Sequence, residues 1–155
     1  MFNGFLQKME KKRFLFKMMP GFEVIPEEQL ADFFPLADQR PQEAYLHPEE
    51  NAIITNKHNL QNHPHPDIVE LKEKAFDKTF NQSPNEAYHS EIIEIKGIDS
   101  LFLQFHMTQP ESLYVAQMHA FSQKQLVSIG FSCPLPAKAN WEKRVREMFE
   151  RARIK

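Results

Sequence analysis

The sequence has one cysteine, four glycines and no long uninterrupted hydrophobic run. Because Cys133 is the single cysteine, the chain cannot be held by an internal disulfide, which fits a reducing compartment such as the cytoplasm. Four scattered glycines cannot compose a phosphate-cradling or dinucleotide-binding motif. No stretch reaches the roughly 18 apolar residues of a membrane span, and the N-terminus alternates apolar and charged residues where a secretory signal needs an apolar core.

An excess of either charge is also missing. The chain carries 19 basic and 21 acidic side chains, a formal net charge of −2, which argues against sequence-independent binding of nucleic acid. Its 155 residues are 41% hydrophobic, which is typical of one globular domain. A domain of this size buries roughly 68–70% of its unfolded surface and needs no disulfide or structural metal to hold it together. We therefore expect a single domain over residues 13–155, preceded by an N-terminal helical extension over residues 1–12.

The expected extension has two interpretations. Apolar residues recur in it at helical spacing: Phe2, Phe5, Leu6 and Met9. Such a face predicts a helix that packs on the domain. The alternative is an amphipathic helix on a membrane surface, next to the basic run 11–13, although nine residues bury too little to anchor a protein alone.

Turn residues and alternation divide the first half of the domain. Pro20 and Gly21 predict a turn, and Pro26 predicts the start of a short helix that ends by Phe33. Alternating residues predict a hairpin of two strands, Glu43–His47 and Ala52–Asn56. The Pro- and His-rich stretch from His58 to Pro66 is expected to be a connecting loop.

A helix is predicted to open at Pro66 and Asp67. Its apolar face holds Ile68, Leu71, Ala75, Phe76 and Phe80 at helical spacing, while Glu70, Lys74, Asp77 and Lys78 are expected to face water. We therefore expect this helix to cover an apolar layer.

Four alternating runs between Tyr88 and Cys133 predict an antiparallel meander. Hairpin geometry pairs Thr108 with Leu113 and Ser122 with Gln125. This register collects one apolar face: Leu101, Leu103, Phe105, Met107, Tyr114, Ala116, Met118, Ala120, Val127, Ile129, Phe131 and Cys133. A slip of one residue would bring polar side chains among them, at a cost of roughly 1–3 kcal/mol for each unpaired group.

A long C-terminal helix is expected after Pro134 and Pro136, with Asn140 as its N-cap. Its buried stripe is Trp141, Val145, Met148, Phe149 and Ala152. The fold class is therefore α+β, with helices packed on a central, mainly antiparallel sheet of about six strands.

Two short segments and this order of elements resemble the PsbP/Mog-like superfamily. The segments are Met19-Pro20-Gly21-Phe22-Glu23-Val24 and Asp38-Gln39-Arg40-Pro41-Gln42-Glu43-Ala44-Tyr45. Small bacterial cytoplasmic members of the superfamily are the most similar. The resemblance implies an α/β/α sandwich around the antiparallel sheet and a non-catalytic, protein-binding role. The partner surface that it implies is formed by Asp38, Arg40, Gln42, Glu43 and Tyr45. Arg40 stands where the Ran-binding members have an acid, which argues against Ran-type binding on electrostatic grounds.

Polar residues on the second face of the predicted meander are candidates for ligand binding. They are Gln104, His106, Gln117, His119, Ser128 and Ser132, flanked by Phe102 and Phe121. Polar groups ringed by aromatics suit a ligand or peptide site, and the alternative is a roofed surface whose polar atoms are satisfied by water.

Two chemical hypotheses are weaker. His58, His63, His65 and Asp67 are potential zinc or copper ligands, but Pro64 and Pro66 stiffen the segment and a solvated loop is the expected outcome. Ser128 is predicted to pair with His119 across a hairpin, without a third, orienting carboxylate.

These observations favour a non-enzymatic, cytoplasmic accessory or adaptor protein that binds an unidentified protein partner. The alternative is a small-molecule or metal-binding module that uses the polar sheet face or the His-rich loop. No cofactor, nucleic acid or membrane span is expected.

Overall fold

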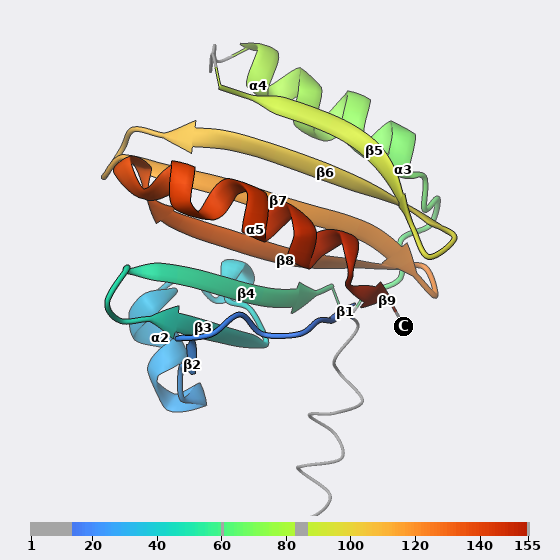
Figure 1. Ribbon diagram of the computed structural model, residues 1–155. Coiled ribbons are helices and arrows are strands. Elements are labelled where there is room, and N and C mark those ends of the chain that lie inside the picture. Colours follow the sequence, from blue (N-terminus) through green and yellow to red (C-terminus); the bar gives the residue numbers. More distant parts are fainter. Residues whose placement is uncertain (1–13, 60, 83–86, 155) are drawn as a thin grey trace, which may run out of the picture.

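The computed structural model describes residues 14–59, 61–82 and 87–154 (Figure 1). The predicted N-terminal extension, with both of its interpretations, lies outside the described residues.

Seven strands form one antiparallel sheet in the order β2-β3-β4-β8-β7-β6-β5. Their bounds are β2 (Glu23–Val24), β3 (Glu43–His47), β4 (Ala52–His58), β5 (His89–Ile95), β6 (Ile98–Met107), β7 (Leu113–Ser122) and β8 (Gln125–Pro134). The expected number of about six was wrong because β2, only two residues long, adds a seventh strand at the edge beside β3. A separate pair joins β1 (Phe14–Leu15) to β9 (Arg153–Ile154), close to the C-terminus.

Helices lie on both faces of the sheet, and the fold class is α+β (Figure 1). One face, called here the α5 face, is covered by α5 (Lys138–Glu150), which follows the 3₁₀ turn η4 (Leu135–Ala137). The other, called the opposite face, is covered near β5 and β6 by one continuous helical segment. This segment comprises α3 (Ile68–Glu70), the π-helical η3 (Leu71–Asp77) and α4 (Lys78–Gln82). Near β3 lie η1 (Glu27–Gln29), α2 (Leu30–Phe33) and η2 (Ala37–Gln39).

The predicted apolar stripe of α5 is confirmed. Trp141, Val145, Met148 and Phe149 are buried, and Ala152 is buried just beyond the helix. The predicted N-cap was wrong, since η4 leads directly into α5 and Asn140 lies inside the helix. Arg146 of the same helix is half-buried, because its guanidinium lies 4.7 Å from the centroid of the Phe102 ring and pairs with Glu91.

The hairpin of β3 and β4 is confirmed, and so is the register of β7 with β8. Ser122 pairs with Gln125 and Met118 pairs with Ile129, as the alternation predicts. Strand β4 of this hairpin pairs with β8, the last strand of the meander, and Ile54 lies opposite Phe131. On the α5 face, β7 and β8 therefore form a continuous apolar surface with Ala52 and Ile54 of β4.

The predicted register of β6 with β7 was wrong by one residue. Met107, not Thr108, lies opposite Leu113, so Phe105 is on the other side of the sheet from Met118 and Ile129. The slip exchanges the two sides of β6: Phe102, Gln104 and His106 join the α5 face, and Leu101, Leu103, Phe105 and Met107 join the opposite face.

The penalty expected for this slip does not arise, because both faces are covered and the polar groups have partners. Leu101 and Leu103 are fully buried on the opposite face. On the α5 face, the Tyr114 hydroxyl donates to Gln104 Oε1 at 2.8 Å, and Lys138 Nζ lies 3.0 Å from His106 Nε2. Alternation favours one register only where a slip would leave polar groups without partners in the core, and here the observed register provides those partners.

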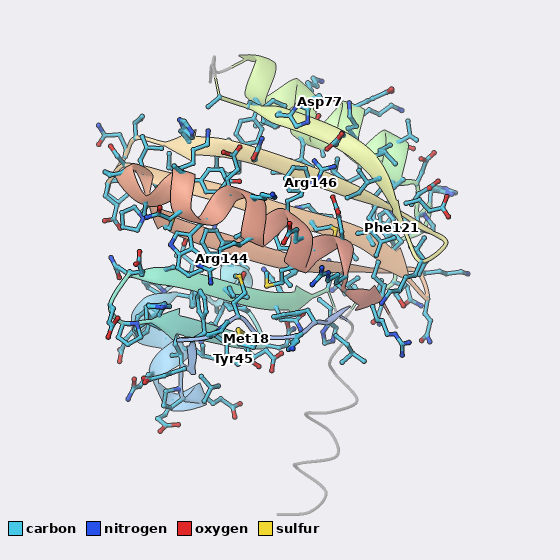
Figure 2. All side chains as sticks on the ribbon, in the orientation of Figure 1. Met18, Tyr45, Asp77, Phe121, Arg144 and Arg146 are labelled. Carbon is cyan, nitrogen blue, oxygen red and sulfur yellow. The ribbon has the colours of Figure 1, made fainter. Side chains whose placement is uncertain are left out.

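The helical segment over residues 68–82 begins as predicted, with Asp67 as its N-cap. Asp67 Oδ1 accepts from the backbone N–H groups of Val69 and Glu70 at 3.0 and 3.2 Å. The π-helical turn then changes which side chains face inward. Asp77, expected to face water, is half-buried and accepts hydrogen bonds from Tyr88 and Ser90 at 2.6 Å and from Lys72 at 2.7 Å (Figure 2).

Candidate functional site

A hydrogen-bonded polar cluster lies on the opposite face where β7 meets β8. His119 pairs with Ser128 in the ladder, and its Nδ1 lies 2.6 Å from Ser128 Oγ. Its Nε2 lies 3.0 Å from Oε1 of Gln117, two residues earlier on the same side of β7. Because the Gln117 oxygen can only accept, Nε2 carries the proton and Nδ1 accepts from the Ser128 hydroxyl.

The ring of His119 is covered by Phe76 from the helical segment. The two rings stack with centroids 4.9 Å apart, and His119 is only 7% exposed. Burial lowers the pKa of His119 to about 4, so the imidazole is neutral at pH 7. A neutral imidazole that accepts from a serine hydroxyl has the form of a general base, but its second nitrogen faces an amide and not a carboxylate.

The structure divides the six predicted binding residues between the two faces of the sheet. Gln117, His119 and Ser128 form the cluster described above, and Ser132 lies on the same face further along β8, beyond Gly130. Gln104 and His106 lie on the α5 face because of the register of β6. The assumption that all six share one surface was wrong.

His106 and Gln104 belong to a second polar group, between β6 and the start of α5. Burial and the nearby Lys138 charge lower the pKa of His106, while burial and the Glu142 charge raise the pKa of the Tyr114 phenol. Lys138 Nζ also lies 5.4 Å from the centroid of the Tyr114 ring. These contacts fasten the first turn of α5 to the sheet.

The four proposed metal ligands have separate structural positions. His58 is buried at the end of β4, and the His63 ring packs edge-on against Phe121 at 5.3 Å. The His65 N–H donates to His63 Nδ1, and Asp67 caps the following helix. Across residues 14–59, 61–82 and 87–154, no three His, Cys, Asp or Glu side chains gather closely enough to hold a metal ion.

The first motif of the resemblance has a packing role. Gly21 adopts φ +90°, and a Cβ there would lie 2.4 Å from the His47 ring. Phe22 meets both His47 and Trp141 edge-on, with ring centroids 5.3 and 5.5 Å apart. The Pro-Gly-Phe turn therefore packs this segment against the start of α5.

Arg40 of the second motif braces a loop. Arg40 donates from Nε to the carbonyl oxygen of Phe34 at 3.1 Å and from its guanidinium to that of Pro35 at 3.3 Å. The Asp38 carbonyl oxygen accepts from Lys57 Nζ. These contacts hold the loop between α2 and β3 in place.

The remaining residues of the second motif lie along β3. The Gln42 side chain donates to the His58 carbonyl oxygen and accepts from the His58 N–H, both at 2.9 Å, and so extends the ladder beyond β3. Glu43 Oε1 accepts from Asn56 at 3.2 Å. Burial and the neighbouring Glu43 carboxylate raise the pKa of Tyr45 to about 12.

A surface that the sequence analysis missed lies around α2. Phe33 is 41% exposed and Leu36 is 58% exposed, although both are large and apolar. Their neighbours Leu30 and Phe34 point inward and pack with Ile25, Ala44 and Leu46. Residues 21–50 carry eight acidic side chains and one basic one, a charge block that could have pointed to this region.

No protein-family model and no curated protein matches the chain in sequence. Among solved structures, it is similar to cyanobacterial PsbP (CyanoP) from Synechocystis sp. PCC 6803, with a TM-score of 0.63 and 7% identity over 94% of this chain and 88% of that one. It is also similar to LpqN, involved in cell envelope biogenesis of Mycobacterium tuberculosis, with a TM-score of 0.56 and 9% identity over 91% of this chain and 82% of that one. The chain has a PsbP-like fold. At these identities the likeness concerns the fold alone.

None of the helices in the part of the chain that the structure describes is long and apolar enough to cross a membrane.

Proposed function

We propose that the protein is a non-enzymatic accessory protein of the cytoplasm, which binds a partner protein through the surface around Phe33 and Leu36. The observation that carries this proposal is the exposure of two large apolar side chains on a braced loop. Burying the exposed half of each side chain would gain roughly 1 kcal/mol, which a bound partner could supply. The buried free thiol of Cys133 fits a reducing compartment.

The charge of the surroundings defines the partner's chemistry. Glu27, Glu28, Asp32 and Asp38 lie in the same short stretch of chain as Phe33 and Leu36, and all four are exposed. Apolar anchors with an acidic rim suit a segment that is basic and amphipathic. The partner surface implied by the resemblance begins at Asp38, and we include Asp38 at the rim of this contact because it is exposed two residues after Leu36. Glu43 and Tyr45 lie on the α5 face of β3, away from α2, and are not part of this contact.

The test is affinity capture from native cytosol with matched variants. The double variant Phe33→Ser, Leu36→Ser should lose a specific partner that the wild type retains. Val69→Ser is the matched control, because Val69 is 47% exposed on α3, outside the acidic block. Retention of every captured protein by the double variant would contradict the proposal.

Salt provides a second readout. If acidic side chains guide a basic partner, capture should weaken as salt is raised, and Asp32→Asn should weaken it further. Capture that does not respond to salt or to Asp32→Asn would leave only the apolar part of the proposed contact.

The alternative, a small-molecule or metal-binding module, receives less support from the geometry. Its six polar residues divide between two faces, and its four proposed metal ligands make separate contacts. Thermal-shift measurements with metals and metabolites would favour this alternative if a ligand raised the melting temperature progressively as its concentration increased.

A further inference from the structure

The two edges of the sheet differ in length. One edge is β2, which has only two residues, and the other is β5, which has seven. Figure 1 shows β5 as the outermost strand, with β6 as its single neighbour in the sheet. The helical segment packs against side chains of this region, with Phe80 stacked on Tyr88 at 4.3 Å and Asp77 bonded to Ser90.

The outer backbone edge of β5 is unpaired. Among the residues that the structure describes, no backbone hydrogen bond joins this edge to another segment. A long edge strand with free donors and acceptors is a template for pairing with another chain.

The hairpin geometry shows which backbone groups face outward. β5 and β6 are joined by a two-residue turn at Lys96 and Gly97, both with positive φ, and Ile95 lies opposite Ile98. The pair that closes such a turn is hydrogen-bonded, and bonded and non-bonded pairs then alternate along the ladder. The backbone groups of Ser90, Ile92 and Glu94 therefore point away from β6.

These three outward-facing residues permit a self-complementary register. If two β5 strands pair antiparallel about a two-fold axis at Ile92, then Ile92 faces its own copy, Ser90 faces Glu94 and Glu91 faces Ile93. All seven residues pair, and no glutamate faces another glutamate. A two-fold axis at Glu91 or Glu94 would oppose identical carboxylates, and one at Ile93 would run into the turn at Lys96.

We propose that the occupant of this edge is a second copy of the chain, which pairs β5 with β5 about a two-fold axis at Ile92. The pairing is isologous, so the same edge serves both copies and the assembly closes as a dimer. Because seven paired residues form a small contact, we expect the dimer to depend on protein concentration. The α2 surface, at the far edge of the sheet, stays free in such a dimer.

Cysteine cross-linking tests the register directly. Opposed Cα atoms of a bonded antiparallel pair lie about 5.5 Å apart, within the usual range for a disulfide. Under mild oxidation, Ile92→Cys should therefore form a disulfide-linked dimer. Glu94→Cys is the matched control on the same strand, since its two copies would lie about 13 Å apart along the strand and should not join. Cys133 is buried and can remain.

Two further variants keep the test decisive. When chains with Ser90→Cys are mixed with chains with Glu94→Cys, the two should form a mixed disulfide. This experiment covers the case in which Ile92→Cys fails to fold. Adding Glu94→Pro to Ile92→Cys removes an outward N–H, so cross-linking should fall to the level of the Glu94→Cys control. Sedimentation of Glu94→Pro alone should show a monomer. Equal cross-linking of Ile92→Cys and Glu94→Cys, or no mixed disulfide from folded chains, would overturn the proposal.

Discussion

The two faces of the sheet are buried by different means. On the α5 face, fully buried side chains of the sheet such as Phe131 and Met118 form one apolar cluster with Trp141 of α5. On the opposite face, the middle of the sheet carries Gln117, His119 and Ser128, which bond to one another under Phe76. Polar residues can be buried in a sheet when the register places their partners side by side.

The largest effect is expected on the α5 face, at Trp141. Trp141→Ala removes a ring that contacts Phe22, His47 and Phe131, so we expect a loss of about 3–5 kcal/mol in the free energy of unfolding. The measurement is urea unfolding followed by circular dichroism.

Trp141→Phe is the matched control for this loss. Trp141 Nε1 is the one buried side-chain N or O atom without a partner among the described residues, so its removal leaves no hydrogen bond broken. We expect a clearly smaller loss than for Trp141→Ala, and equal losses would contradict the packing argument.

The second effect is pH dependence on the opposite face. His119 has a pKa of about 4 when folded and 6.5 as its ordinary value, so below pH 6.5 the unfolded chain binds a proton that the folded chain does not. The free energy of unfolding should therefore fall as the pH falls from 6.5 to about 4, by about 3 kcal/mol in all.

His119→Gln checks this assignment. His106 also has a lowered pKa, so the informative quantity is the difference between the wild type and His119→Gln over the same pH range. Identical pH profiles would show that His119 is not the group responsible.

The third effect tests how closely β4 and β8 approach on the opposite face. A Cβ at Gly130 would lie 2.7 Å from Thr55 Oγ1, and β-branched threonine has little freedom to move away. Gly130→Ala should cost about 1–3 kcal/mol. In a double-mutant cycle, Thr55→Ala should recover most of this loss, and simple additivity of the two changes would rule out the proposed clash.

The smallest effect concerns Asp77, which ties the helical segment to the opposite face. Burial would raise the pKa of Asp77, but hydrogen bonds from Lys72, Ser90 and Tyr88 outweigh it and lower the pKa. Asp77→Asn should cost about 1–2 kcal/mol at pH 7 in urea unfolding.

The same residue gives a pH test. The wild type should lose this stabilisation as the pH falls from the ordinary aspartate value of 3.8 through the lower folded-state value, because the folded-state pKa is depressed. Asp77→Asn should lose none there, so the difference between the two proteins should shrink in acid. A constant difference would contradict the role given to the charge.

Much of the fold could be predicted from local patterns. The alternation of β7 and β8 gave their register, and the His119–Ser128 contact follows from it. The stripe from Trp141 to Phe149 gave the buried side of α5, and Asp67 marked the start of a helix. Each of these predictions depends only on residues that are near one another in the chain or are joined by a tight turn.

The candidate sites were harder to predict, because their membership depends on which strands lie opposite one another. The grouping of Gln104 and His106 with His119 was wrong because the loop before Leu113 is one residue longer than expected. Arg40, interpreted as a partner contact, bonds to backbone carbonyls of its own loop. Neither the length of that loop nor the hydrogen bonds of Arg40 produce a periodic pattern in the sequence.

What the sequence by itself determined is the longer strands and helices, their order, and the apolar sides of α5, β7 and β8, since these follow from periods of 2 and about 3.6 residues. Only the tertiary structure decided the register of β6, the inward turn of Asp77 and the choice of β2 and β5 as the edges of the sheet. A strand buried on both faces has no wet side to favour one register, so packing and hydrogen-bond partners from distant segments make that choice.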